Sequence, residues 1–479
     1  MTPQRNKIKK IHFVGIKGVG MAPLAIIAKQ AGLHVTGCDV EEVFITDEEL
    51  IKAGITPIVG FSKDHIAGFD LVIATGAHGG LENPEVKEAV VRKIQVLSQG
   101  EALGVFQKGE IFGKDFFGIS IAGSHGKTTA TAIVATMLSE NNLDPSFVIG
   151  TGEVPSLGSS GHFGKGKYFV AEADEYLADV VSDKTPKFLF QNPNIILVTN
   201  IDYDHPDVFS SIDDLMSAFN KFTENLPQDG VLIAYGDGVE NRKFIADFKG
   251  RKITYGSSPD NDYILERVSF DSDRMFFWVK NGETILGQFS VGVFGEQNAL
   301  NSLGSVVVGL ELGLSIDQIK KGLSVFKGTK RRSEFIGNLQ NGGLVYDDYA
   351  HHPQEIKKTL EAFRKSFPKY KIIPIFQPHM YSRTKRFFSD FANSFSDSDE
   401  VLITEIFPSF REEVDKNFSS RLLAQEIKKF GKNAAYFANP ADVVKYVSSQ
   451  NYSKNTLVIT MGAGDIYKIG KELMLNGSR

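Results

Sequence analysis

Short apolar segments alternate with helix-like segments along most of this 479-residue chain, and this alternation limits the possible folds more than any other feature. Near the N-terminus, residues 11–15 and 35–39 have the apolar character of buried strands, and residues 20–31 between them have the pattern of a helix. Residues 71–75 follow as a further strand. Strands that alternate with helices usually pair in parallel, with the helices on the faces of the sheet. The sequence therefore predicts the α/β class.

The length of the chain predicts more than one domain. A chain of 479 residues exceeds what a single hydrophobic core usually supports, and about 150 residues per domain gives roughly three domains. A second series of strand and helix patterns begins near Phe116, and a third begins after Lys330. We therefore expect a Rossmann-like domain over residues 1–112, a central P-loop ATPase-like domain over 113–329 and a second Rossmann-like domain over 330–479.

Within these domains the patterns predict further elements. In the central domain they are strands at 117–122, 168–172 and 195–199, a helix at 127–140, short antiparallel strands between 262 and 293, and a helix at 296–312. Asn281-Gly282 is the expected turn between two of the short strands, because this pair favours tight hairpins. In the third domain, strands are expected at 343–347, 371–375, 401–404 and 456–460.

Composition excludes several classes of protein. Lys and Arg number 53 against 58 Asp and Glu, a net charge of −5, which argues against a broad nucleic-acid-binding face. Cys38 is the single cysteine, so a disulfide within the chain is impossible, and its apolar surroundings predict a buried core thiol. We find neither a secretory signal nor a run of about 18 apolar residues. The expectation is a cytoplasmic protein without membrane insertion.

The strongest local signal is a phosphate-binding loop between a strand and a helix. Glycines let backbone N–H groups approach phosphate oxygens, and the helix N-terminus adds partial positive charge. Lys127 is suited to the β- and γ-phosphates of ATP, and the Thr128 hydroxyl to Mg²⁺. Ile121 stands where the full Walker pattern has its first Gly, so the loop is a short variant. The predicted ATP-binding residues here are Gly123, Ser124, His125, Gly126, Lys127, Thr128 and Thr129.

Acidic residues and a histidine follow the next two strands of the central domain. Glu172-Ala-Asp174-Glu175 ends one strand, and Asn200 to His205 ends the other. In an open parallel sheet, ligands gather beyond the carboxyl ends of the strands. We therefore expect Thr128 and Glu172 to hold Mg²⁺ near Lys127, and His205 to complete a site for a second Mg²⁺ or Mn²⁺. Polar turns and helix caps are the alternative reading of the two acidic segments.

A glycine-containing loop also follows the first strand. Gly15, Gly18, Val19 and Gly20 resemble a dinucleotide-binding loop, but Lys17 interrupts the fingerprint where the backbone has to approach the pyrophosphate. A nicotinamide-dependent dehydrogenase is therefore disfavoured.

Together these motifs resemble the Mur ligase family. The central motifs match in kind and order, and so do His12 to Met21 in the first domain. In the third domain the matching segments are Tyr346–Pro353, Phe376–Thr384 and Met461–Asp465. The resemblance covers nearly the whole chain and implies three domains that bind a UDP-linked substrate, ATP and an amino acid.

The resemblance also implies a reaction and assigns residues to it. An ADP-forming ligase of peptidoglycan precursor synthesis would activate UDP-N-acetylmuramate as an acyl phosphate and join it to L-alanine, with Lys127, Glu172 and His205 as catalytic residues. The UDP-substrate residues would be Gly15, Gly18, Val19, Gly20, Asp39 and Thr75; further ATP contacts would be Asn298, Asn301 and Arg332; and the amino acid would meet His379, Arg383 and His352. Arg383 suits a carboxylate, because its guanidinium forms two-pronged contacts.

Some positions depart from the family pattern, and alternatives stay open. Lys17 stands where Gly is usual, Gln297 where His is usual, and Met380 where some members have Arg. The segments Glu175-Tyr176 and 202–207 are closer to the ligase that attaches a recycled tripeptide to UDP-N-acetylmuramate. Glycine and L-serine are other possible amino substrates, a non-catalytic nucleotide-binding regulator is the alternative of another class, and the protein is expected to be a monomer or a homodimer.

Overall fold

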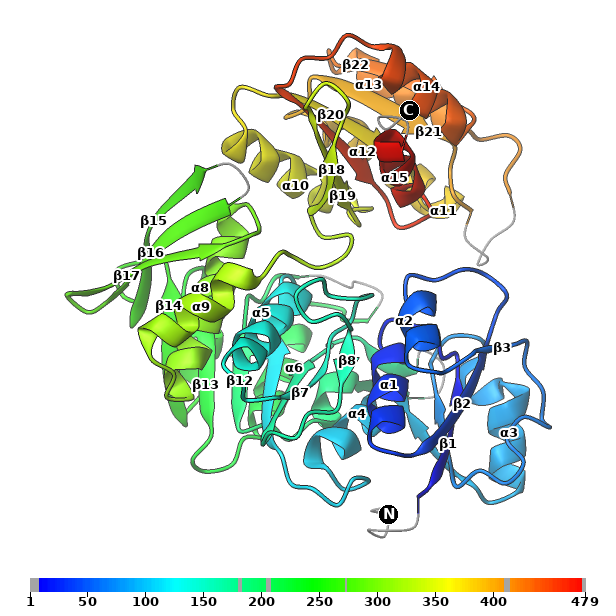
Figure 1. Cartoon of the computed structure of the whole chain (residues 1–479), viewed down its shortest axis with the longest axis vertical. Coiled ribbons are helices and arrows are strands. Elements are labelled where there is room, and N and C mark those ends of the chain that lie inside the picture. The colour runs from blue at the N-terminus through cyan, green and yellow to red at the C-terminus, as the bar shows by residue number, and fades with distance from the viewer. Residues whose placement is uncertain (1–7, 180–182, 204–207, 272–273, 409–413, 476–479) are drawn as a thin grey trace. The chain divides into compact units, whose positions relative to one another are not determined.

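The computed structural model describes residues 8–179, 183–203, 208–271, 274–408 and 414–475 (Figure 1). It consists of two compact units. The first comprises Met1–Gly292 with Gln297–Lys327, and the second comprises Val293–Glu296 with Gly328–Arg479.

The first unit begins with a five-stranded sheet of order β3-β2-β1-β4-β5, in which every pair is parallel. Its strands are β1 (Lys10–Val14), β2 (His34–Asp39), β3 (Ile58–Val59), β4 (Leu71–Ala74) and β5 (Gln95–Ser98). Its helices are α1 (Ala22–Gln30), α2 (Asp47–Lys52), η1 (Gly80–Glu82), α3 (Pro84–Val91) and α4 (Gln99–Lys108). The chain adds strands first on one side of β1 and then on the other. The loops after β1 and β4 therefore flank a topological switch point, where α/β folds usually bind ligands.

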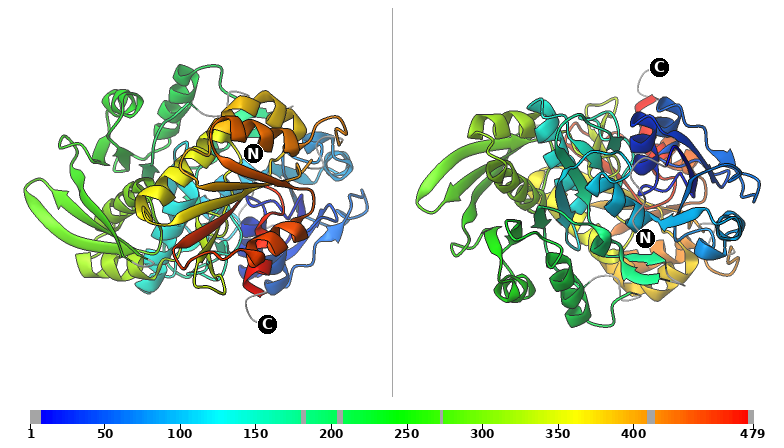
Figure 2. Two further views of the ribbon diagram at one scale, coloured as in Figure 1. Left: turned by 90° about the horizontal axis from the view of Figure 1, so that it is seen from above. Right: turned by 90° about the horizontal axis from the view of Figure 1, so that it is seen from below.

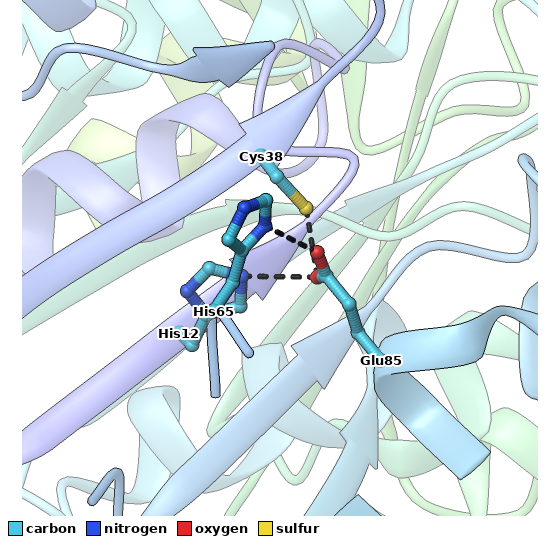
Figure 3. Close-up of side chains that lie close together, drawn as sticks. All are labelled: His12, Cys38, His65 and Glu85. Carbon is cyan, nitrogen blue, oxygen red and sulfur yellow. Dashed lines mark hydrogen bonds and ion pairs between the residues drawn. The ribbon is translucent and has the colours of Figure 1, made fainter. Parts of the chain in front are cut away.

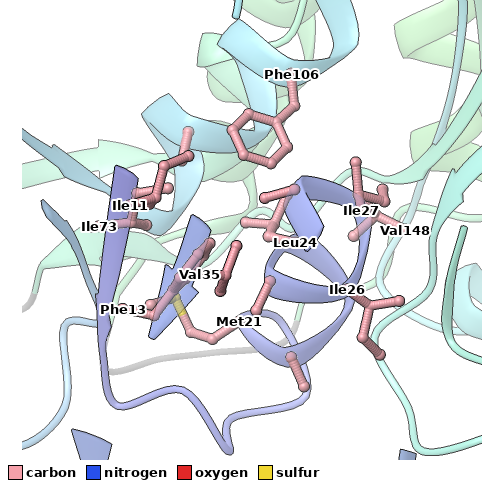
Figure 4. Close-up of a cluster of buried hydrophobic side chains, with 14 of the residues drawn as sticks. Ile11, Phe13, Met21, Leu24, Ile26, Ile27, Val35, Ile73, Phe106 and Val148 are labelled. Carbon is pink, nitrogen blue, oxygen red and sulfur yellow. The ribbon is translucent and has the colours of Figure 1, made fainter. Parts of the chain in front are cut away.

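The core beneath this sheet continues into the central part of the first unit. Ile11 and Phe13 of β1 pack with Leu24 of α1 and Phe106 of α4 (Figure 4). Val148, from a strand of the central sheet, belongs to the same buried cluster. Burial of apolar side chains supplies most of the favourable free energy of folding, so this shared cluster joins the two sheets of the first unit.

The central sheet has ten strands in the order β17-β16-β15-β14-β13-β12-β6-β9-β7-β8. They are β6 (Phe117–Ala122), β7 (Ser146–Val148), β8 (Gly161–His162), β9 (Tyr168–Glu172), β12 (Ile195–Val198), β13 (Val231–Tyr235), β14 (Arg251–Gly256), β15 (Tyr263–Asp271), β16 (Arg274–Asn281) and β17 (Thr284–Val291). The remaining elements are α5 (Lys127–Glu140), β10 (Leu177–Asp179), β11 (Asp183–Pro186), η2 (Lys187–Phe190), α6 (Ile212–Thr223), α7 (Val239–Asp247), α8 (Glu296–Glu311) and α9 (Ile316–Val325). β6 lies between β12 and β9, which brings three predicted motifs to neighbouring strand ends.

The second unit contains a six-stranded sheet of order β18-β19-β23-β20-β21-β22, parallel except at β18. The strands are β18 (Glu334–Asn338), β19 (Leu344–Asp348), β20 (Lys371–Phe376), β21 (Glu400–Thr404), β22 (Asn433–Phe437) and β23 (Thr456–Met461). The helices are α10 (Pro353–Ser366), α11 (Tyr381–Arg386), α12 (Phe388–Asn393), α13 (Ser420–Lys429), α14 (Pro440–Ser449) and α15 (Tyr467–Leu475).

Both faces of this sheet are covered by helices (Figure 2). Ile373 and Ile375 of β20 share a buried cluster with Val443 of α14 and with Leu473 of α15. Phe376 points to the opposite face, where its ring centroid lies 5.5 Å from that of Phe391 in α12. The alternation of side chains along a strand explains why one strand serves both layers.

These observations confirm the predicted α/β class and the buried position of Cys38. Burial and the neighbouring Glu85 carboxylate raise the pKa of the Cys38 thiol well above its ordinary range. Helix α5 and strand β9 have the predicted bounds, and Asn281-Gly282 joins β16 to β17. Among the described residues, no helix is long and apolar enough to cross a membrane.

Candidate active site

The phosphate loop connects β6 to α5, and two of its glycines have no room for a side chain. Gly123 has φ of +135°, and an added Cβ would lie 2.1 Å from Thr199 Oγ1. Gly126 has φ of +84°, and its Cβ would lie 2.4 Å from Asn301 Oδ1. Gly126 is also the N-cap of α5 and offers no capping side chain. The first N–H groups of α5 are thus available to an anion.

The end of β12 holds this loop in place. Ser124 N donates to Asn200 O at 3.1 Å, and His125 N donates to Asn200 Oδ1 at 2.9 Å. Thr199 Oγ1 donates to His125 O at 2.5 Å, and Ser124 Oγ donates to Asp202 O at 2.7 Å. Asn200 belongs to a motif predicted from the sequence, whereas Thr199 had no predicted role. The only local sign that Thr199 supports the loop is its position directly after the apolar strand β12.

Lys127 is a buried cation at the start of α5. Its Nζ donates to Gly123 O at 2.7 Å and lies 2.8 Å from Glu175 Oε2. Burial alone favours the neutral amine, but the carboxylates of Glu175, Asp174 and Glu172 outweigh it and raise the pKa of Lys127. The loop therefore carries a positive charge that a carboxylate balances in this structure. A phosphate would compete with Glu175 for this charge.

Thr128 and Glu172 form an oxygen-rich pair beside Lys127. Thr128 Oγ1 donates to Glu172 Oε1 at 3.1 Å, and Gly150 N donates to Glu172 Oε2 at 3.0 Å. Burial raises the pKa of the Glu172 carboxyl, so a nearby cation would stabilise its charged form. Hydroxyl and carboxylate oxygens are the ligands that Mg²⁺ prefers, and this pair fits that ion. His205, the third predicted ligand, lies outside the described residues.

Asn301 of α8 lies against the phosphate loop at Gly126, and Asn298 lies one turn earlier on the same helix. Asn301 is 2% exposed, and its Nδ2 donates to Asn298 Oδ1 at 3.3 Å. Within the described part of the chain, Asn301 Oδ1 has no hydrogen-bond partner, although it faces Gly126. A buried oxygen left without a donor is costly, so this position favours a donor from a ligand or a water molecule. A contact to adenine or ribose stays a prediction.

The N-terminal loop is organised by Asp39. The carboxylate of Asp39 accepts from Lys17 N at 2.7 Å and lies 3.4 Å from His78 Nε2. Burial opposes its charge, but the contacts with His78 and with the Lys17 backbone lower the pKa of Asp39. Gly15 has φ of +80°, and its Cβ would lie 2.3 Å from the Thr75 Cγ2 atom. Predicted UDP-substrate residues therefore pack around one loop, with Asp39 bracing its backbone.

Lys17 has a structural role in place of the usual glycine. Its side chain is buried, and its Nζ donates to Val40 O at 3.0 Å and to Glu42 O at 2.7 Å. The ammonium group thereby holds the segment after β2 beside the loop. α1 begins beyond Gly20 at Ala22, whose N donates to Gly18 O at 2.9 Å, so the loop leads directly into the helix.

In the second unit, Arg383 lies on α11 with one buried nitrogen, Nη1, that has no hydrogen-bond partner among the described residues. Burial and the Arg383 guanidinium lower the pKa of His351, against the opposing effect of the Glu355 carboxylate. The ring of His379 stacks on that of Phe407 at 5.8 Å and lies 6.1 Å from that of His351. A guanidinium with one unsatisfied buried nitrogen suits a carboxylate ligand.

Two other predicted residues of this unit have structural contacts. His352 is the N-cap of α10, where its N donates to Glu355 Oε2 at 3.0 Å. Arg332 is exposed and lies over the Tyr349 ring at 5.5 Å. Arg331, which had no predicted role, is buried and pairs with Asp347 at 3.1 Å. The ligand roles of His352 and Arg332 stay predictions.

Three family descriptions match the chain in order. Residues 10–110 match "Mur ligase family, catalytic domain", residues 121–309 match "Mur ligase middle domain", and residues 331–464 match "Mur ligase, glutamate ligase domain". The match follows the three-part arrangement of the sheets.

Curated relatives and solved structures agree with these matches. UDP-N-acetylmuramate–L-alanine ligase of Desulfitobacterium hafniense is 39% identical, covering 97% of this chain and 99% of the relative. The ligase of the same name from Lachnospira eligens is 39% identical, covering 97% of each chain. The crystal structure of UDP-N-acetylmuramate-alanine ligase from Thermotoga maritima superposes with a TM-score of 0.79 at 27% identity, covering 98% of this chain and 99% of that chain. A murein peptide ligase from Psychrobacter arcticus shares the fold, with a TM-score of 0.65 at 24% identity.

Proposed function

Because this chain belongs to the Mur ligase family, we propose that it is an ADP-forming ligase that joins L-alanine to UDP-N-acetylmuramate. The observation that carries the proposal is 39% identity over nearly the full length of ligases with that activity in their names. The reaction would supply a precursor of peptidoglycan. A cytoplasmic location, where ATP is available, is part of the proposal.

The proposed reaction has two steps. A carboxylate oxygen of UDP-N-acetylmuramate forms a bond to the γ-phosphorus of ATP, and the bond between that phosphorus and the β,γ-bridging oxygen breaks, which releases ADP. The amine of L-alanine then attacks the acyl carbon, phosphate leaves, and the amine loses a proton. Both reactants of the first step are negative, so positioning and charge neutralisation are the main tasks of the enzyme.

The residues of the phosphate loop suit these tasks. Lys127 would exchange its contact with Glu175 for one with the β- and γ-phosphates, and the glycines of the loop would present N–H groups to phosphate oxygens. Mg²⁺ bound at Thr128 and Glu172 would offset negative charge on ATP. His205 is proposed as a ligand of a second metal ion. Arg383 would bind the carboxylate of L-alanine and orient its amine.

The test is phosphate release from ATP, measured with and without UDP-N-acetylmuramate and with one amino substrate at a time. L-Alanine, glycine, L-serine and the tripeptide are the substrates to compare, and mass spectrometry identifies the UDP-linked product. We expect turnover only with all three substrates present and the highest kcat/KM for L-alanine. Preference for the tripeptide would assign the chain to the recycling reaction, and ATP binding without turnover would indicate a regulator.

A further inference from the structure

Four side chains that take no part in the proposed reaction meet between the N-terminal sheet and α3. They are His12 on β1, Cys38 on β2, His65 in the loop before β4, and Glu85 on α3 (Figure 3). One ligand atom from each residue lies within 4.8 Å of those from the other three. His12, Cys38 and Glu85 are fully buried, and the side chain of His65 is 22% exposed. The cluster is thus enclosed, with one imidazole near the surface.

Glu85 is the centre of this cluster. Its Oε2 lies 3.0 Å from His12 Nε2 and 2.8 Å from Cys38 Sγ, and its Oε1 lies 2.7 Å from His65 Nδ1. Ser62 N also donates to Oε1 at 2.8 Å. Without a metal these contacts form a satisfied hydrogen-bond network, so a structural role without any ion is the competing explanation.

The donor set nevertheless suits a transition metal. A thiolate, two imidazoles and a carboxylate are all common ligands of Zn²⁺, and together they carry two negative charges that match the ion. With metal–ligand distances of about 2.0–2.3 Å, tetrahedral ligands lie about 3.3–3.8 Å apart. The contacts to Glu85 would lengthen by less than about 1 Å, and the widest separation in the cluster, at most 4.8 Å, would shorten by up to about 1.5 Å.

The surroundings of His12 support the same interpretation. Its Nδ1 lies 2.7 Å from Thr36 Oγ1 on the neighbouring strand, which leaves Nε2 directed at the centre of the cluster. Metal-binding histidines usually have such a partner on the second ring nitrogen, because it fixes the ring orientation and the tautomer. Four protein ligands would leave no open coordination position, so the site would be structural and not catalytic.

We propose that His12 Nε2, Cys38 Sγ, His65 Nδ1 and a Glu85 carboxylate oxygen bind one Zn²⁺ ion that stabilises the N-terminal sheet. On binding, the Cys38 thiol loses its proton to solvent and each imidazole binds in its neutral form. The ion would join β1, β2 and α3 near the loop at Gly15, whose N donates to Cys38 O at 2.9 Å. This inference does not depend on the proposed ligase activity.

The test uses Co²⁺ as a spectroscopic substitute for Zn²⁺ in the full-length protein without nucleotide. Cys38 is the only cysteine of the chain, so a thiolate-to-cobalt charge-transfer band reports this site alone and not the ATP site. We expect one equivalent of Co²⁺ to produce that band together with strong tetrahedral visible absorption, and one equivalent of Zn²⁺ to remove both. Zn²⁺ should also raise the unfolding temperature by at least about 3 °C.

Two variants and a control complete the experiment. Cys38→Ser keeps a hydrogen-bond donor but should lose the charge-transfer band, and His65→Gln changes the most exposed member and should weaken Co²⁺ binding at least tenfold. His34→Gln, at an exposed histidine on β2, should behave like the wild type. Absence of the band with excess Co²⁺ in folded wild-type protein would overturn the proposal, as would equal binding by the wild type and His65→Gln.

Discussion

At the scale of single residues, the charge of Lys127 is the most informative feature of the phosphate loop. A buried ammonium requires a negative partner, and Glu175 provides one 2.8 Å away. The ion pair with Glu175 keeps Lys127 charged. A phosphate oxygen could replace the Glu175 carboxylate as its partner when ATP binds. Among the described residues, the buried Asn301 Oδ1 that faces Gly126 has no hydrogen-bond partner, so it marks another position next to the loop that a ligand could satisfy.

We expect Lys127→Ala to lower the rate of phosphate release at least about 100-fold, because a positioned cation that stabilises transferring phosphate charge typically contributes that much. Circular dichroism should show an unchanged fold. Lys187→Ala is the matched control, since Lys187 pairs with the neighbouring Asp174 at 2.8 Å and lies outside the loop. A rate within threefold of the wild type for Lys127→Ala would exclude the proposed role.

At the scale of elements, close backbone contact holds α4 against η2. An added Cβ on Gly104 would lie 2.2 Å from the backbone oxygen of Phe190, and backbone cannot move aside as a flexible side chain can. An added Cβ on Gly100, one turn earlier, would lie 3.1 Å from Lys187 Cα. This stripe of small residues therefore permits the packing between the N-terminal and central sheets.

Gly104→Ala should lower the free energy of unfolding by about 1–3 kcal/mol, because overpacking forces the two elements apart. Gly470→Ala on α15 is the control: its nearest atom, Thr460 Oγ1, is at an ordinary 3.4 Å. That change should be neutral or stabilise by up to about 1 kcal/mol through helix propensity. Urea unfolding measures both variants, and equal effects would contradict the steric argument.

Glu400 makes the stability of the second unit dependent on pH. The side chain is buried and accepts from Lys371 Nζ at 2.7 Å and from Tyr446 Oη at 2.7 Å. Burial opposes ionisation, but these partners outweigh it and lower the pKa of Glu400. A carboxyl with a lowered folded pKa contributes stability above its unfolded pKa, about 4.3, and loses it as pH falls through the folded value.

Glu400→Gln should therefore destabilise the second unit by about 1.5–3 kcal/mol at pH 7, where a charged hydrogen-bond partner is lost. The difference in stability between Glu400→Gln and the wild type should become smaller below about pH 4. Hydrogen exchange of the β21 amides is the suitable measurement, because the single tryptophan, Trp278, lies in the first unit. Glu361→Gln, at a half-exposed pair with Lys365, should have little effect at either pH.

Elements that carry their own periodic pattern were predictable, and contacts that depend on strand order were not. The bounds of β9 and α5 follow from local apolar patterns and a glycine turn. β7 and β8 have three and two residues and show too little pattern to identify. The pairing of β6 with β12, which places Asn200 under the phosphate loop, joins residues about 75 positions apart. No local motif encodes that separation.

For the whole molecule, the proposed ligand sites are divided between the two compact units. The phosphate loop, Glu172 and the loop at Gly15 belong to the first unit, whereas Arg383 and His379 belong to the second. Asn301, a predicted ATP contact, belongs to the first unit, and Arg332, another, belongs to the second. The domain boundaries near residues 112 and 329 stay a prediction. This division means that a change at the amino-acid site should leave binding to the first unit intact.

Arg383→Lys tests this separation. A point ammonium cannot reproduce the two-pronged contact of a guanidinium with a carboxylate. Loss of one charged hydrogen bond costs about 1.5–3 kcal/mol, so the KM for L-alanine should rise roughly tenfold to a hundredfold. The constants for ATP and UDP-N-acetylmuramate should change less than twofold. Arg386→Lys, at an exposed arginine of the same helix, is the matched control and should leave all three constants unchanged. Apart from Arg332, the residues assigned to the other two substrates belong to the first unit. An equal rise in all three constants for Arg383→Lys would therefore mean that the arginine supports the architecture of the second unit and does not bind the amino acid.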